Sequence, residues 1–509
     1  MTKTIVGVIF HDTKVYFSVF EKTYPNISKI KPLDLAISFQ DGKVNTFEDA
    51  YKKQTCISGL TDCQLLSQKI ANDQNAQKYC SDVFKLWVLL MKKIQEHIVS
   101  KIEGEIEYIF AIPETNHTSL RDVIFVACKA NDMKLLKIIP TSVCAMMGFQ
   151  ANSYYSRKEG NSFVPKLMMN INLDDNHCTF TSFIVSRDRI LNIHSTHARL
   201  GMSKFVQVIA QHILQSSGVQ LHDLYDYWEM KYRKKLNDFY TVINAFSEGN
   251  VTKTYYRDDD ENTFTIERET VAGLFKPYLD FFASIANVEK ETALGLLKQM
   301  QSVEPELMKT MKYSGIFFTG EHKNAFVINA VENIVGCVND STVNQQMIIA
   351  EGCGWIAEKM KLKNMSERQQ ATQQYNMYIY ERCVDIESIV SPNTILLMSG
   401  DGQTQIGLFP TQPQMSTEPI MIPNSVPGNY QVYLVDFFFT TEGQQQNEFP
   451  LIGNVEAKQK NFGIFVNESL GNMIGYVSTF NSNGSEGFQF CYEKGCELPP
   501  SENNNLETF

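Results

Sequence analysis

The chain has 509 residues, of which 43% are hydrophobic and 11% aromatic, so it can bury more than one core and we expect two or three domains. Its formal net charge of −11 argues against a broad nucleic-acid surface, because phosphate binding needs clustered Lys and Arg. The local basic run KYRKK at 231–235 is typical of a solvated helix face.

Cysteine usage and hydropathy indicate the compartment. The 11 cysteines are scattered without a framework spacing, which is typical of reduced thiols inside a cell. The N-terminus lacks a basic segment followed by an uninterrupted apolar one, and no run of about 18 apolar residues exists. We therefore expect a cytoplasmic protein with neither a secretory signal nor a membrane partner.

The first predicted elements form a β-hairpin in VGVIFHDTKVYFSVF (6–20). Hydrophobic residues alternate on both sides of the polar turn HDTK, which is the period expected of paired strands. A buried strand at 106–113, an apolar-striped helix at 117–132 and another strand at 135–140 follow.

A second hairpin is predicted from 166–173 and 178–185, which flank the turn DDNH, and 189–196 extends its sheet. Residues 203–245 and 268–312 are helix-rich. A buried strand at 315–320 and a helix at 325–336 complete this region, so residues 1–365 are expected to form one α/β domain.

The character of the chain changes after residue 365. Residues 366–383 are polar and Gln-rich, which indicates a linker. Short strands separated by Gly- and Asn-containing turns fill 384–482 and predict a β-sandwich. Residues 483–509 are predicted to be a polar tail.

This order of two hairpins, a helix and a later strand–Gly–helix resembles the nucleotide-binding domain of the heat-shock-70 chaperone family. That family opens with a pattern like V-G-I-D-L-G-T-T-Y-S-C-V-G-V-F, which residues 6–20 match without a gap. The resemblance covers roughly residues 1–480. It implies an α/β actin-like, two-lobed domain of the nucleotide-binding type, followed by an all-β sandwich similar to the family's substrate-binding domain, and we expect no helical lid.

The positions that carry the family's phosphate chemistry differ in this chain. Ile9 stands at the Asp that helps to organise magnesium's water, His11 at the phosphate-loop Gly and Asp12 at the next Thr, whereas Thr13 is retained. The family's D-L-G-G-G-T-F-D is similar to NLDDNHCTF (172–180), with Asn172 at the Asp position and Asp174 within the replaced glycines. HARLGMSKF (197–205) is similar to T-H-L-G-G-E-D-F and keeps Gly201.

The positions that would contact adenosine differ as well. The family's adenosine helix is most similar to LNDFYTVINAFS (236–247), which puts Tyr240 at the Glu position and Ile243 at the Lys position and keeps Ser247. The segment similar to V-G-G-S-T-R-I-P is FTGEHKNAF (318–326), where Gly320 is retained, Glu321 replaces Ser, and Lys323 stands where Arg would cover adenine.

The resemblance thus implies a degenerate nucleotide pocket. A phosphate nest needs close backbone N–H groups, which favours Gly, and hydroxyl donors. Asp12 and Asp174 would instead place carboxylates beside the phosphates, at a cost of about 4 kcal/mol for each unit-charge pair about 4 Å apart. Magnesium bridging these carboxylates to phosphate is the alternative of a retuned site, but Ile9 and Tyr240 argue against it. We expect a pseudo-ATPase without a bound cofactor, in which residual ATP binding stays open.

Two further interpretations concern histidines and peptides. His11 and His177 could form a metal pair with nearby acids, but we favour polar residues that simply fill two solvent-facing turns. The family's peptide cleft would fall near Leu397, Ser399 and Met415, although plain sandwich core is the favoured interpretation of these residues. The family's apolar interdomain linker falls on VDIES (384–388), whose polar groups would weaken its docking.

The predicted function is therefore binding without nucleotide-driven cycling. The first hypothesis is a co-chaperone or binding module in a larger chaperone or ribosome-associated machine, with a J-domain protein, a chaperone or the ribosome as partner. The second is a structural subunit of a stable cytoskeletal or ciliary assembly. The third is a functional ATP-dependent chaperone.

Overall fold

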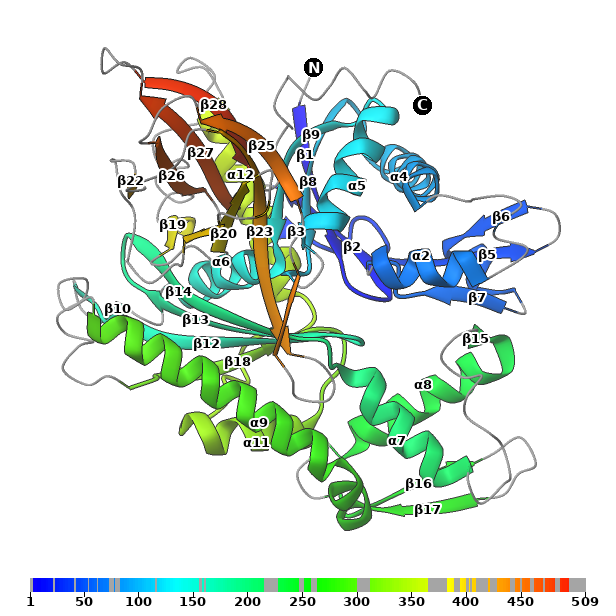
Figure 1. The fold of residues 1–509 in the computed structure, drawn as a ribbon. Helices are drawn as coiled ribbons and strands as arrows, with labels where there is room; N and C mark the ends of the chain where they lie inside the picture. Colours follow the sequence, from blue (N-terminus) through cyan, green and yellow to red (C-terminus); the bar gives the residue numbers. More distant parts are fainter. Residues whose placement is uncertain are drawn as a thin grey trace.

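The computed structural model shows a mixed α/β protein with several mixed sheets and helices (Figure 1). It describes residues 3–21, 23–40, 43–53, 55–61, 63–72, 77, 83–114, 117–154, 158–159, 162–214, 228–246, 251–257, 263–299, 312–364, 382–388, 394–399, 402, 405–408, 420–421, 428–439, 445–448, 451–457, 462–469, 472–480 and 486–493. Within these residues, no helix combines the length and the apolar character needed to cross a membrane.

The first large sheet has the strand order β3-β2-β1-β8-β9, with β4 beside β2. Its strands are β1 (Lys3–Phe10), β2 (Lys14–Glu21), β3 (Tyr24–Asn26), β4 (Leu33–Asp34), β8 (Glu105–Ile112) and β9 (Lys134–Pro140). β1 pairs antiparallel with β2 and parallel with β8, and β8 pairs parallel with β9. The predicted hairpin and the two strands predicted at 106–113 and 135–140 are thereby confirmed, and the structure adds that these two strands pair in parallel.

Successive residues of β1 enter two different cores, because side chains alternate across a strand. Val6, Val8 and Phe10 pack in the core that contains α4 (Val83–Val99) and α5 (His117–Ala130). Ile5 and Ile9 pack on the opposite face. That second core also contains α6 (Thr141–Ser153) and α12 (Ile348–Asn364), as well as residues of the second large sheet, so these two helices lie between the sheets.

A smaller sheet of order β15-β7-β5-β6 adjoins the first. Its elements and neighbours are β5 (Ala36–Gln40), β6 (Lys43–Thr46), α1 (Phe47–Tyr51), β7 (Thr55–Ser58), α2 (Cys63–Asn72) and β15 (Trp228–Glu229). Because β15 comes from a distant part of the chain, this sheet connects residues near 55 to residues near 229.

The second large sheet repeats the strand arrangement of the first. Its first part has the order β18-β12-β13-β14. The strands are β12 (Lys166–Leu173), β13 (Cys178–Val185), β14 (Arg189–Ala198) and β18 (Gly315–Thr319). β12 pairs antiparallel with β13 and parallel with β18, as β1 does with β2 and β8. The second predicted hairpin is confirmed at the predicted residues.

Helices cover this sheet and complete its core (Figure 1). They are α7 (Met202–Leu214), α8 (Met230–Ala245), α9 (Arg268–Gln299) and α11 (Ala325–Val335), as the helix-rich segments predict. Two small hairpins, β10 (Lys158–Glu159) with β11 (Ser162–Phe163) and β16 (Lys253–Arg257) with β17 (Thr263–Glu267), lie in the connections.

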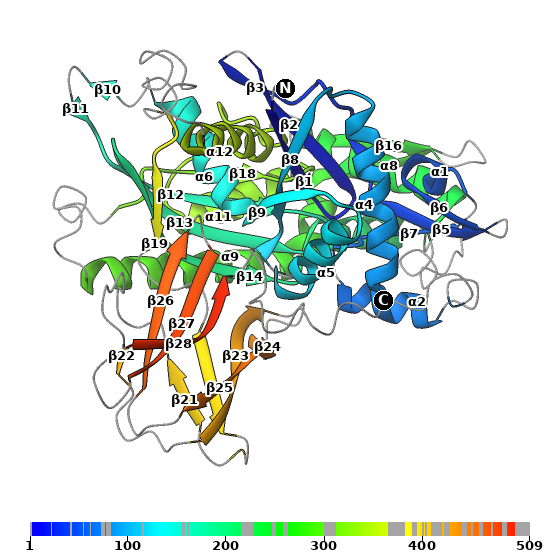
Figure 2. The same cartoon turned by 90° about the horizontal axis from the view of Figure 1, so that it is seen from above.

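The described residues after 384 form strands only, in agreement with the absence of predicted helices there. They are β19 (Asp385–Ser388), β20 (Thr394–Ser399), β21 (Gln405–Leu408), β22 (Ile420–Met421), β23 (Gly428–Phe439), β24 (Gln445–Glu448), β25 (Leu451–Ala457), β26 (Phe462–Ser469), β27 (Asn472–Phe480) and β28 (Glu486–Glu493). In Figure 2 most of these strands gather at the lower end of the view. One sheet has the order β22-β26-β27-β28, and β23 pairs with β20 and β25.

Two strands differ from the sequence predictions. β19 pairs in parallel with β14, with Asp385 opposite Arg189, so the segment expected to dock weakly is part of a sheet. Backbone hydrogen bonds make this ladder, and they do not depend on the polarity of the side chains. β28 lies inside the predicted polar tail and pairs with β27, so the sheet extends beyond residue 482. Alternation of Phe488, Phe490 and Tyr492 explains this strand.

A buried acid connects β14 to α9. Glu289 is fully buried, and its Oε2 lies 2.6 Å from His194 Nδ1 and accepts a 2.7 Å hydrogen bond from Thr196. Burial disfavours the charged imidazole, but the Glu289 carboxylate outweighs burial and raises the pKa of His194 above its ordinary value of 6.5. The pair thus stabilises the folded state while His194 is charged.

We expect His194→Gln to change how the free energy of unfolding depends on pH. The contribution of a raised histidine pKa is complete below 6.5 and is lost as the pH rises through the pKa of the folded state. The difference in stability between wild type and variant should therefore shrink as the pH rises above 6.5. Urea denaturation over a pH series measures it. His212→Gln, at an exposed position of α7, is the control; equal slopes for both variants would contradict the role of His194.

Candidate functional site

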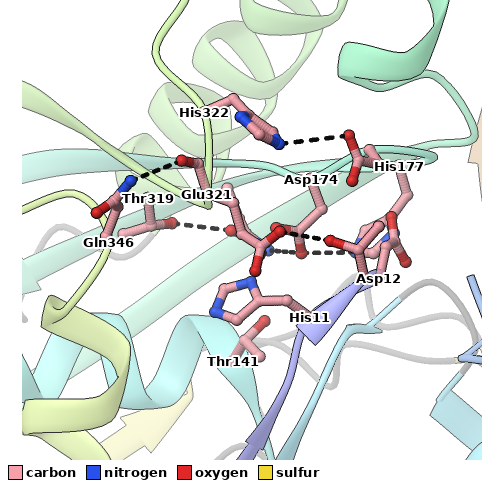
Figure 3. A network of polar contacts seen from close by, with 12 residues as sticks. His11, Asp12, Thr141, Asp174, His177, Thr319, Glu321, His322 and Gln346 are labelled. Atoms are coloured by element: carbon pink, nitrogen blue, oxygen red, sulfur yellow. Dashed lines mark hydrogen bonds and ion pairs between the residues drawn. The ribbon is translucent and has the colours of Figure 1, made fainter. Parts of the chain in front are cut away.

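The candidate site lies where three turns meet between the two large sheets. The turn between β1 and β2 contributes His11 and Asp12, and the turn between β12 and β13 contributes Asp174 and His177. The third turn joins β18 to α11. Figure 3 shows the labelled side chains of these turns pointing toward one another. All four residues named here are at most 3% exposed, so the prediction of two solvent-facing turns is wrong: the turns bury each other.

Imidazoles and carboxylates alternate across the first two turns. His11 Nδ1 lies 2.9 Å from Asp174 Oδ1, and His177 Nδ1 lies 3.1 Å from Asp12 Oδ2. His177 Nε2 also lies 3.4 Å from Asp174 Oδ2. Each buried carboxylate thereby faces at least one imidazole from the opposite turn, which is the arrangement that makes buried charge tolerable.

The pKa shifts follow from this pairing. Burial alone would lower the pKa of His11 and of His177, but the carboxylates of Asp174 and Asp12, respectively, reverse the effect and raise both values. Burial would raise the pKa of Asp174, yet the two imidazoles hold it well below its usual range. The pairing therefore favours the charged form of both imidazoles and the ionised form of Asp174.

Asp12 occupies an anion position made by the facing turn. Its Oδ2 accepts a 2.7 Å hydrogen bond from the backbone N–H of Asn176, and its Oδ1 accepts a 2.8 Å bond from the hydroxyl of Thr61. Backbone N–H groups of a turn and a nearby hydroxyl are the donors that a phosphate nest offers to an anion. In this protein the anion that they bind is a side chain of the protein itself.

The N-terminus of α7 is satisfied by backbone rather than left open. The amides of Met202 and Ser203 each donate a 2.8 Å hydrogen bond, to the carbonyls of Asp174 and Asp175. A Cβ on Gly201 would lie 2.3 Å from the Asp174 carbonyl oxygen, so only Gly permits this close approach. The helix end that could otherwise bind an anion is thus closed by the β12–β13 turn.

The third turn brings a second group of polar residues. Asp175 accepts a hydrogen bond from the hydroxyl of Tyr240, and His322 Nε2 lies 3.8 Å from Asp175 Oδ1. The rings of Tyr240 and His322 stack with centroids 3.8 Å apart. Glu321 Oε2 accepts a 2.6 Å hydrogen bond from Thr13. This group therefore connects α8 and the β18–α11 turn to both hairpins.

Burial dominates the titration of this second group. It raises the pKa of Asp175 to about 8, with a further contribution from the charge of Glu321. It lowers the pKa of His322 to about 4. Burial and the Glu321 carboxylate also raise the pKa of Tyr16 well above its ordinary value. His11 and His177 balance the charges of Asp12 and Asp174. The hydroxyl groups that bind Asp175 and Glu321 are neutral and provide no such balance.

Gly320 sets the position of the third turn. Its φ is +116°, and a Cβ there would lie 2.1 Å from the carbonyl oxygen of Leu173. The side chains of Gln345 and Gln346 donate to the carbonyls of His322 and Glu321, at 2.7 and 2.9 Å. Backbone constraints therefore fix this turn against β12.

The structure brings most of the predicted pocket residues together and leaves some outside the polar network. Asn172 donates to Asp174 at 3.2 Å and accepts from Thr319 at 3.1 Å. Ile9 and Ile243 are fully buried in apolar cores. Lys323 is exposed. Ser247 lies outside the described residues.

The residues of the predicted peptide cleft are placed only in part. Leu397 is fully buried in β20, between Ile406 of β21 and Val432 of β23. Ser399 is half-buried at the end of the same strand. Met415 lies outside the described residues, so peptide binding stays a prediction.

Sequence reasoning did not find three participants. Thr61 reaches the site from a segment without a motif, whereas Asn176 and His322 lie in the segments 172–180 and 318–326 but were not among the predicted site residues. His322 follows Glu321 directly, and this adjacency of two metal-ligating residue types was the available signal. Nothing in the sequence connects Thr61 to Asp12, because the contact depends on how the small sheet folds against the hairpin.

Comparison with protein-family models gives no match to this chain, and comparison with curated proteins gives none.

We expect Asp12→Ala to lower the free energy of unfolding by about 3 to 5 kcal/mol, because it leaves the buried His177 and the Asn176 amide without their acceptor. Chemical denaturation measures the loss. The matched control is Asp188→Ala, an exposed aspartate in the turn between β13 and β14, which should change stability by less than about 0.5 kcal/mol. Equal, small effects of both substitutions would show that the network does not hold the turns together.

Proposed function

We propose that this protein is a non-cycling, heat-shock-70-like binding module that works in a larger chaperone or ribosome-associated machine and does not hydrolyse ATP. The strand orders support the actin-like part of the proposal. In each large sheet an antiparallel hairpin is flanked by a third antiparallel strand on one side and by a parallel strand on the other. Two such sheets with helices between them agree with a two-lobed domain that resembles this family.

The observation that carries the proposal is the occupation of the anion position by Asp12. A phosphate at the Asn176 amide would have to displace a carboxylate that this amide, Thr61 and His177 already bind. A phosphate that joined the carboxylate instead would be repelled by about 4 kcal/mol for a unit-charge pair at about 4 Å. Both routes oppose nucleotide binding.

The adenosine side supports the same conclusion. The resemblance places adenine near Tyr240 and Lys323, but Tyr240 stacks on His322 and binds Asp175. Ile243, at the position of the family's Lys, is buried in the core of α7, α8 and α9. Ile9, at the position of the family's Asp, cannot orient a metal's water through a charge, which argues against hydrolysis.

The C-terminal strands suit a module with a fixed arrangement. β19 pairs with β14, and Phe439 at the end of β23 pairs with Ala198 at the end of β14. We propose that residues 384–482 form a β-sandwich that contributes a surface for a protein partner. These strand pairs join the C-terminal strands to the second large sheet. They favour a surface that is always exposed to the partner over one that nucleotide binding would rearrange.

Titration with Mg-ATP should leave the thermal unfolding midpoint unchanged up to millimolar concentrations. A ligand at about 100 times its dissociation constant would add about 2.7 kcal/mol of stability, which differential scanning fluorimetry resolves easily. Release of phosphate should equal that of the buffer blank. A saturable shift that Tyr240→Ala abolishes would contradict the proposal and favour an ATP-dependent chaperone.

Fractionation of cell extract distinguishes the assemblies. For a module of a ribosome-associated machine, the native chain should co-sediment with ribosomes at low salt and dissociate at high salt, because exposed charged contacts are screened. Mass spectrometry of material co-purified with the native chain then identifies the partner. Retention in a cytoskeletal pellet through detergent and high salt would instead indicate a structural subunit of a stable assembly.

A further inference from the structure

Three potential metal ligands meet beside the imidazole–carboxylate network. They are Asp175, Glu321 and His322, and one ligand atom of each lies within 4.8 Å of the others. His322 Nε2 and Asp175 Oδ1 are 3.8 Å apart. Two ligands at about 2.1 Å from a tetrahedral metal are about 3.4 Å apart, so the His322–Asp175 pair is already close to this separation, and side-chain shifts of up to about 1.4 Å would bring in the third ligand.

The charges at this point are unbalanced. Asp12 and Asp174 face His11 and His177 at 2.9 to 3.4 Å. Asp175 and Glu321 instead accept hydrogen bonds from the neutral hydroxyls of Tyr240 and Thr13. Within the part of the chain that the structure describes, the only ion-pair partner within 4 Å of either carboxylate is His322. Keeping both of these buried groups ionised is costly without a cation, and a divalent cation in place of the proton would neutralise both.

A second observation concerns one oxygen of the Glu321 carboxylate. Glu321 is 8% exposed, and its Oε1 is buried without a hydrogen bond of normal geometry, although Oε2 is bound to Thr13 and the Tyr16 hydroxyl lies near the carboxylate. A buried carboxylate oxygen normally has a partner. A metal ion would provide one, since the other ligands lie within coordination range.

The surroundings orient the ligands as outer-shell groups do in metal sites. The Tyr240 hydroxyl fixes Asp175, the Thr13 hydroxyl fixes Glu321, and the Tyr240 ring stacks on the imidazole. Gly320 and the two glutamine bonds hold the backbone of the third turn. His322 is 21% exposed, so an ion can reach the site from solvent.

We propose that Asp175, Glu321 and His322 bind one divalent cation of the Zn²⁺ or Mn²⁺ type. One imidazole with two carboxylates suits these metals, whereas Mg²⁺ prefers oxygen ligands alone. The ion joins the β12–β13 turn to the β18–α11 turn and, through Thr13, to the first hairpin. It is a structural clasp that involves no nucleotide, so this proposal stands or falls separately from the proposed function.

Isothermal titration of the full chain, stripped with a chelator and free of nucleotide, tests the site. Zn²⁺ and Mn²⁺ are titrated separately, and Mn²⁺ controls for the cysteines because it disfavours thiolate ligands. We expect one ion per chain with micromolar or tighter affinity for Zn²⁺, weaker binding of Mn²⁺, and a raised unfolding midpoint with either metal. Mg²⁺ should have little effect. Bound Co²⁺ should give visible absorption bands typical of a site with one nitrogen and several oxygen ligands.

Two variants test the ligands. His322→Gln, at a partly exposed position, and Glu321→Gln, which keeps an oxygen for Thr13 and removes a buried charge, should both fold. Each should weaken Zn²⁺ and Mn²⁺ binding at least about 100-fold and remove the Co²⁺ bands. Without metal, the thermal unfolding midpoint of Glu321→Gln should equal or exceed that of the wild type, because the variant removes a buried charge. A variant that lost metal binding because it misfolded would have a lower midpoint.

Matched controls are His212→Gln on α7 and Glu269→Gln on α9, both exposed. They should bind the metals like wild type. The proposal is overturned if the wild type shows no saturable binding, or if the control variants lose as much affinity as His322→Gln and Glu321→Gln. It is equally overturned if only Zn²⁺ binds and neither ligand variant weakens it, since thiols would then be the ligands.

Discussion

The contact between the Asp12 carboxylate and the Asn176 amide determines how the two large sheets meet. It joins a turn of the first sheet to a turn of the second, and His177 and Thr61 complete its surroundings. A turn amide that faces the other sheet needs an acceptor, and here the Asp12 side chain supplies it. The protein thus joins its two large sheets at this point through its own side chains.

The other features of the site follow from this closure. With two carboxylates buried between the sheets, His11 and His177 must be present to balance them, and their pKa values rise accordingly. Asp175 and Glu321 form no ion pair with these two imidazoles within the described residues, and they gather beside His322 instead. A permanently occupied anion position and a cation clasp beside it would both favour a rigid arrangement of the sheets, which agrees with a binding module that presents one surface.

Much of the secondary structure could be predicted from local pattern. Alternation in 6–20 and in 166–185 predicts both hairpins, because the strands bury one or both faces and their turns are polar. β28 was missed because its aromatic alternation lies within a polar, Asn- and Glu-rich context. The docking of β19 on β14 was missed because backbone pairing leaves no mark on the side chains.

For the site, the sequence by itself determined which chemical groups are present: carboxylates and an imidazole stand in the two hairpin turns at His11, Asp12 and Asp174. Only the tertiary structure decided that these groups are buried, that each acid of the first pair has an imidazole partner, and that Thr61 and His322 join them. The reason is that burial and pairing depend on distances between turns more than 100 residues apart, and residue types along the chain do not specify those distances.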